Sequence, residues 1–116
     1  MATLLVVDDE RPILKLIALV LGSEHRVITA ESGIEALAVF ESYHNRIDLI
    51  VTDVTMPGMS GLDLVARLEA LHKRRFPVLF ITGASERPID ASRAVLLKPF
   101  TPSGLQDRVR QLLQNP

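Results

Sequence analysis

The chain has 116 residues, no cysteine and a net charge of −1, and hydrophobic residues make up 47% of it. These values predict one folded domain over residues 1–116, and they exclude a disulfide scaffold, a cysteine-ligated zinc and a thiol nucleophile. The near-neutral charge gives no electrostatic reason to expect nucleic acid or an anionic membrane as partner, and no apolar stretch approaches the ~20 residues of a membrane-spanning helix. The cysteine-free composition, with no secretory signal at the start, favours a cytoplasmic protein.

Short apolar runs alternate with longer periodic segments along the chain. The runs predict five strands, at 3–7, 26–30, 48–52, 77–82 and 94–97. The periodic segments predict helices at about 11–22, 32–42, 60–71 and 101–113. Pro88 interrupts any long helix between the last two strands, so we expect a short or irregular fourth helix there.

Helical spacing assigns a buried stripe to each periodic segment. The residues expected to face inward are Ile13, Leu14, Ile17, Leu21, Ile34, Leu37, Ala38, Phe40, Leu64, Val65, Leu68, Leu71, Leu105, Val109, Leu112 and Leu113. The strands are apolar throughout rather than alternating, which indicates burial on both faces. Strands that alternate with helices in this way predict an α/β fold with a parallel sheet and right-handed crossovers.

Polar residues follow four of the apolar runs at the points where the strands end. They are Asp8, Asp9, Glu10, Asp53, Thr82 and Lys98. In parallel sheets the ligand site lies beyond the carboxyl ends of the strands, at the topological switch point. We therefore expect these side chains to form one acidic pocket that contains a single lysine.

Carboxylates packed in one pocket need a positive partner. Two negative charges about 5 Å apart repel by roughly 3 kcal/mol at an effective dielectric of about 20. A few protein oxygens with several waters are typical of a Mg²⁺ site. Acids near Pro12 could instead complement the positive end of the first helix, but that interpretation does not account for Asp53, Thr82 and Lys98.

Asp53 is the candidate nucleophile of this pocket. A carboxylate can attack phosphorus to give an acyl phosphate, and such a transfer depends mainly on positioning and charge neutralisation. Lys98 would supply a positive charge and Thr82 a hydroxyl donor. Taken singly, each residue has an ordinary explanation: a loop aspartate, a strand threonine and a surface lysine. Gly83 and Ala84 are small enough to let the chain approach a phosphoryl group, and a cis Lys98–Pro99 bond would aim the lysine.

These residues occur in four motifs, which are Val7-Asp8-Asp9-Glu10, the segment from Thr52 to Gly61, Ile81-Thr82-Gly83-Ala84 and Lys98-Pro99-Phe100. In this order, they make the chain similar to the receiver domains of two-component response regulators, the CheY-like family, from Leu4 to about Leu113. The resemblance implies a flavodoxin-like, doubly wound, five-stranded parallel sheet in the order 2-1-3-4-5, with five helices on both faces. It also implies a phosphorelay role.

The resemblance also implies roles for individual residues. Asp53 would accept a phosphoryl group from a phosphohistidine on a histidine kinase, a histidine phosphotransfer protein or a covalently linked kinase module. Asp9, Asp53 and the backbone carbonyl of Thr55 would bind Mg²⁺ directly, and Asp8 would assist through water. Thr82 and Lys98 match the family's switch hydroxyl and its lysine. Such a domain is not an enzyme in the ordinary sense, because its own chemistry is limited to autophosphorylation and autodephosphorylation.

Two departures from the family pattern concern the output of the domain. Val95 stands where the family commonly has an aromatic residue, three positions before the lysine. Thr82 and Lys98 are only 16 positions apart (98 − 82), fewer than usual, so the fourth helix must be shortened or lost. That feature resembles receivers attached to hybrid sensor kinases. Thr55 and Ala84 flank the path of an attacking water, and we expect them to set the dephosphorylation rate.

Two other functions use similar residues. An aspartate-nucleophile phosphohydrolase of the haloacid dehalogenase type needs a second aspartate two positions after the nucleophile, where this chain has Thr55. A pseudo-receiver would act only as a phosphorylation-independent interaction module, and the presence of all the pocket residues disfavours it.

Overall fold

The computed structural model describes residues 1–43, 46–83 and 89–114. Its elements in chain order are β1 (Thr3–Val7), α1 (Arg11–Gly22), β2 (Arg26–Ala30), α2 (Gly33–Tyr43), β3 (Leu49–Asp53), α3 (Gly61–His72), β4 (Val78–Thr82), β5 (Ala94–Leu97) and α4 (Pro102–Gln114). All five predicted strands are present, and the third and fourth each begin one residue later than expected. Within the described residues, no helix is long and apolar enough to cross a membrane.

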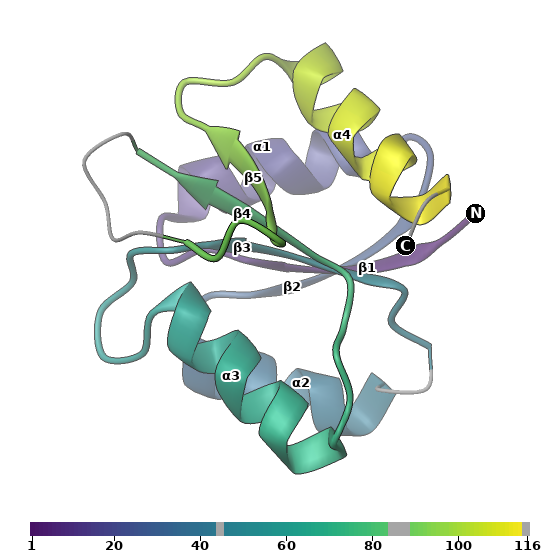
Figure 1. Ribbon diagram of the computed structural model, residues 1–116. Coiled ribbons are helices and arrows are strands. Elements are labelled where there is room, and N and C mark those ends of the chain that lie inside the picture. The colour runs from purple at the N-terminus through teal and green to yellow at the C-terminus, as the bar shows by residue number, and fades with distance from the viewer. Residues whose placement is uncertain (44–45, 84–88, 115–116) are drawn as a thin grey trace.

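The five strands form one parallel sheet in the order β2-β1-β3-β4-β5, as predicted. Helices α1 and α4 cover one face of the sheet, and α2 and α3 cover the other (Figure 1). The resemblance implied five helices, whereas the described residues contain four. The architecture is the predicted flavodoxin-like α/β fold.

The sheet separates two hydrophobic cores. Along β1, Leu5 and Val7 pack with α2 and α3, whereas Leu4 and Val6 pack with α1 and α4. This double burial explains why the inner strands are apolar along most of their length, since each fully buried Val or Leu contributes roughly 1.5–3 kcal/mol. Because both faces are buried, polar side chains are found mainly at the ends of the strands, where the candidate site lies.

Three residues predicted to face inward are exposed, and one of them is Ala38 on α2. Ile34 on α2 is 73% exposed, and Leu71 on α3 is 66% exposed. Helix α2 instead buries Gly33, Ala36 and Phe40. A Cβ atom on Gly33 would lie 2.7 Å from the Met59 sulfur, so this glycine lets the start of the helix pack closely against the β3–α3 loop. That contact orients the helix and turns the larger Ile34 side chain to solvent.

The connection between β4 and β5 is where a short or irregular fourth helix was expected. Residues 89–93 of this connection contain no helix, and Pro88 and Ala84 lie outside the described residues. Val95, at the usual aromatic position, is half-buried and packs against the core beneath α2 and α3.

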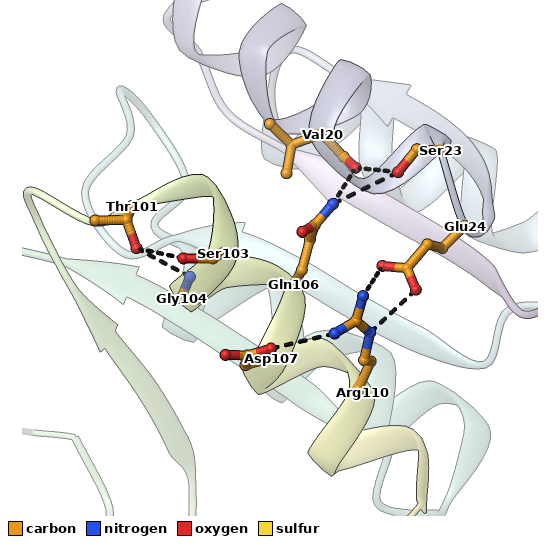
Figure 2. A network of polar contacts seen from close by, with 9 residues as sticks. All are labelled: Val20, Ser23, Glu24, Thr101, Ser103, Gly104, Gln106, Asp107 and Arg110. Atoms are coloured by element: carbon orange, nitrogen blue, oxygen red, sulfur yellow. Dashed lines mark hydrogen bonds and ion pairs between the residues drawn. The ribbon is translucent and has the colours of Figure 1, made fainter.

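Polar side chains join the carboxyl-terminal helix α4 to the end of α1 (Figure 2). The Arg110 guanidinium donates to both carboxylate oxygens of Glu24, at 3.0 and 2.8 Å. The Gln106 amide donates to the Val20 carbonyl at 3.2 Å and to the Ser23 hydroxyl at 3.5 Å. These bonds lie outside the apolar contact between the two helices and align α4 along α1.

Candidate functional site

Strand register brings four polar residues to one edge of the sheet. Val7 pairs with Thr52, so Asp8 emerges beside Asp53 at the ends of β1 and β3. Asp53 pairs with Ile81, one residue before Thr82, and Lys98 follows the last residue of β5. The predicted pocket therefore forms because the strands are parallel and their carboxyl ends coincide.

Asp53 and Lys98 form an ion pair within this pocket. The distance from Lys98 Nζ to Asp53 Oδ1 is 3.3 Å, and the two side chains are 31% and 3% exposed, respectively. The Lys98 backbone N–H donates to the Thr82 carbonyl at 2.9 Å, and the Lys98–Pro99 bond is cis. Partial burial opposes the charge of the lysine, but Asp53 and, to a smaller extent, Asp8 and Glu10 raise the pKa of Lys98.

Asp8 is an almost completely buried carboxylate, with an exposed fraction of 1%. Its Oδ1 accepts a hydrogen bond from the Glu10 backbone N–H at 2.8 Å, whereas Oδ2 accepts none from the described residues. Burial raises the pKa of Asp8 to about 6, opposed by the Glu10 hydrogen bond and supported by the nearby charge of Asp53. A cation at this position would compensate the buried charge.

The carboxylates of Asp8, Glu10 and Asp53 form the acidic group of the site. One oxygen from each lies within 4.8 Å of the others, a spacing at which one metal ion could be held. Asp9 is exposed and is not a member of this group in the described part of the chain. Its role as a ligand remains a prediction. Glu10, which the sequence placed in the pocket without a role as a metal ligand, is exposed and contributes one oxygen to this group.

The two threonines of the predicted site differ in burial. Thr82 is buried, and its hydroxyl donates to the Gly83 carbonyl at 3.1 Å. Thr55 is exposed in the loop after β3, next to Val54, whose N–H donates to the Ile81 carbonyl at 3.0 Å. Ala84, predicted to flank the path of an attacking water, lies outside the described residues. Thr82 thus belongs to the wall of the pocket and Thr55 to its solvent-facing rim.

Gly61, the first residue of α3, packs directly beneath the nucleophile candidate. A Cβ atom here would lie 2.2 Å from the Asp53 carbonyl oxygen and 3.0 Å from the Thr52 hydroxyl oxygen. The Gly61 N–H donates to the Val54 carbonyl at 2.8 Å, and Ser60 caps the helix by accepting from the Asp63 N–H at 3.1 Å. The sequence motif included Gly61 without showing this role, because the close approach depends on how α3 meets the end of β3.

The fold and this edge of the sheet define a class of protein: flavodoxin-like α/β domains in which further acids and a lysine lie beside a buried aspartate at the end of β3. The family model for the response regulator receiver domain matches residues 4–110. The chain belongs to this family. It is a receiver domain of the kind found in two-component response regulators, and neither the fold nor the family match favours the phosphohydrolase or the pseudo-receiver.

Relatives of this chain differ widely in length. The chemotaxis protein CheY of Pseudomonas aeruginosa is 30% identical over 96% of this chain and 95% of its own length. The sensor kinase CckA of Brucella abortus is 33% identical over 97% of this chain, which spans 13% of that kinase. A receiver domain structure from Clostridium thermocellum superposes with a TM-score of 0.85 at 30% identity, covering 98% of this chain and 95% of its own. Similar domains thus occur nearly alone and within much longer proteins.

Proposed function

We propose that Asp53 is the phosphoacceptor of this receiver domain. The observation that carries the proposal is the position of its carboxylate, buried at the carboxyl end of β3 and 3.3 Å from the Lys98 ammonium. In the reaction, a carboxylate oxygen of Asp53 forms a bond to phosphorus. The bond between phosphorus and the donor nitrogen of phosphohistidine breaks, and its electron pair stays on the imidazole.

Lys98 and Thr82 act on the phosphoryl group rather than on the nucleophile alone. The Lys98 charge offsets the negative charge that gathers on the phosphoryl oxygens during transfer. The Thr82 hydroxyl, now bonded to the Gly83 carbonyl, donates to a phosphoryl oxygen once Asp53 is modified. This exchange of hydrogen-bond partners would couple phosphorylation to the β4–β5 connection.

The acidic group supports a proposal for the metal. Asp9, Asp53 and the Thr55 carbonyl would hold Mg²⁺, with Asp8 assisting through water, as the family resemblance implies. The buried Asp8 Oδ2, which accepts no hydrogen bond from the described residues, fits a site that takes a cation. When bound, the ion would neutralise charge on the transferring group and orient it toward Asp53.

The phosphoryl donor would be a histidine kinase or a histidine phosphotransfer protein. We propose that the single domain of residues 1–116 exchanges phosphoryl groups in the cytoplasm and has only autophosphorylation and autodephosphorylation activity of its own. The similarity to the sensor kinase CckA supports covalently linked kinase modules as one setting for it. Neither nucleic acid nor membrane is a proposed partner of this domain.

The test is incubation with phosphoramidate or acetyl phosphate and Mg²⁺, followed by intact-mass spectrometry. We expect one phosphoryl adduct on the wild type, none on Asp53→Asn and none when chelator removes Mg²⁺. Glu41→Gln, which removes an exposed acid on α2, is the matched control and should keep the adduct. An adduct that persists in Asp53→Asn would place the phosphoacceptor elsewhere.

A further inference from the structure

Glu10 occupies the N-cap position of α1, but its side chain makes no capping hydrogen bond with the described residues. Its backbone carbonyl accepts the first helical bond, from the Leu14 N–H at 2.9 Å. A glutamate that served the helix alone would be expected to bond or face the free N–H groups of the first turn. The Glu10 carboxylate is instead within 4.8 Å of the Asp8 and Asp53 carboxylates.

The placement of Glu10 follows from a turn that Asp8 itself closes. The Asp8 Oδ1 atom accepts from the Glu10 N–H at 2.8 Å, which holds the backbone of Glu10 against the pocket. Asp9 and Glu10 are both exposed, but among the described residues only Glu10 joins the acidic group. The turn therefore directs the first and third acids of the run toward Asp53.

An independent observation concerns the Asp8 carboxylate, which is buried and only partly bonded within the described residues. Asp8 is 1% exposed, and its Oδ2 accepts no hydrogen bond within the described residues. A buried carboxylate oxygen left in this way costs free energy unless a charge arrives. Lys98 is bonded to Asp53, so one lysine faces three carboxylates.

We propose that Glu10 is a further cation-holding residue of the receiver site, acting together with Asp8 and Asp53. The proposal rests on the proposed function in that it concerns the same divalent cation, but it does not require that Asp53 be phosphorylated. Glu10 thereby adds affinity for the cation and takes no part in the transfer of the phosphoryl group.

The proposal and a plain helix-terminus role predict different results for Glu10→Gln. A charge that only complements the helix dipole stabilises the protein equally with and without the cation. A cation-holding charge repels its neighbours when the cation is absent and attracts the cation when it is present. Only in the second case does the substitution reduce the rise in unfolding temperature that the cation produces.

The experiment measures Mg²⁺ affinity of the unphosphorylated full chain by calorimetry, and the Mg²⁺-induced rise in unfolding temperature, at constant ionic strength. Residues next to a metal site typically contribute 10–100-fold to affinity, so we expect Glu10→Gln to weaken Mg²⁺ binding about tenfold and to shrink the thermal shift. Glu10→Ala should behave likewise. Glu35→Gln, which removes the same charge from the first turn of α2, should change neither quantity.

Unchanged Mg²⁺ affinity in Glu10→Gln would overturn the proposal, as would a wild type that binds no Mg²⁺. If Asp9→Asn loses affinity while Glu10→Gln retains it, the cation is held through Asp9 without Glu10, and the proposal again fails. Failure of the proposed function gives a different pattern, in which Mg²⁺ binds and Glu10 matters but no phosphoryl adduct forms on Asp53.

Discussion

Two clusters of charged side chains, each partly shielded from solvent, lie at opposite ends of the sheet, and they are built differently. At the amino end of β4, Arg93 and Glu69 form a close ion pair that is largely shielded from solvent. The second Glu69 oxygen accepts from the Phe76 N–H at 2.8 Å, and Arg93 also donates to the Phe76 carbonyl at 3.2 Å. Each charge in this set faces an opposite charge and a backbone partner.

The set at the carboxyl ends of the strands is unbalanced. Asp8, Glu10 and Asp53 face Lys98, and the Asp8 Oδ2 atom accepts no hydrogen bond from the described residues. A balanced buried pair serves structure, because removing either member leaves the other uncompensated. In an unbalanced set, the uncompensated negative charge can still be stabilised by a cation that binds. The charges at the carboxyl ends of the strands therefore serve function, and those at the amino end of β4 serve stability.

The largest expected effect comes from filling the space beneath Asp53. Gly61→Ala would place a methyl group 2.2 Å from the Asp53 carbonyl oxygen, and the strain should lower the free energy of unfolding by about 3 kcal/mol. Gly22→Ala is the matched control, because no atom lies within 4 Å of the new Cβ at the end of α1. Urea denaturation measures both variants. Equal stabilities would show that α3 is not held tightly against β3.

The next largest loss of stability is expected from breaking the Arg93–Glu69 ion pair. Arg93→Ala leaves the Glu69 carboxylate without its cation, so we expect the free energy of unfolding to fall by about 2–3 kcal/mol. Arg75→Ala removes a nearby exposed arginine that bonds only the Ser92 hydroxyl among the described residues, and it should cost about 0.5 kcal/mol or less. If both variants unfold at the wild-type denaturant concentration, the Arg93–Glu69 pair does not stabilise this end.

Removing a charge from the unbalanced set should raise the free energy of unfolding, whereas the two changes above lower it. The pKa of Asp8 is about 6 in the folded chain and 3.8 in the reference state, so the folded state binds a proton more tightly between these values. Its contribution to stability therefore falls as pH rises from about 4 to about 6, by roughly 3 kcal/mol in total.

Asp8→Asn keeps an oxygen for the Glu10 N–H and removes the charge. Without Mg²⁺, it should raise the free energy of unfolding by about 2 kcal/mol at pH about 7.5 and by almost nothing at pH about 4. Chelator-treated samples, denatured with urea at both pH values, give the comparison. A gain that is the same at both pH values would argue against the titration of Asp8 as the cause.

The smallest effect on stability is expected at Thr55, on the exposed rim of the site. Thr55→Ala should change the free energy of unfolding by less than about 0.5 kcal/mol. It should nevertheless change the lifetime of phosphorylated Asp53, because the sequence predicts that this side chain flanks the path of an attacking water. The measurement is the loss of the phosphoryl adduct with time. A lifetime equal to that of the wild type would remove Thr55 from the control of dephosphorylation.

Much of the fold and site could be predicted from local patterns. The apolar runs located all five strands, and the alternation with helices led to the parallel sheet. The pocket residues Asp8, Asp53, Thr82 and Lys98 could be found because each follows a run directly. Ile34, Ala38 and Leu71 were assigned to the core wrongly, since helical spacing identifies an apolar stripe but not which part of it touches the sheet.

The sequence by itself determined the order of elements and the residue types at the strand ends, because burial on both faces of a parallel sheet demands continuous apolar runs and moves polar groups to their ends. Only the tertiary structure decided how those groups are arranged. A turn closed by the Asp8 carboxylate brings Glu10 into the acidic group, and the close approach of α3 requires the glycine at Gly61. The first depends on the direction of side chains and on the approach of β1 to β3, and the second on how α3 meets the end of β3, none of which a one-dimensional pattern contains.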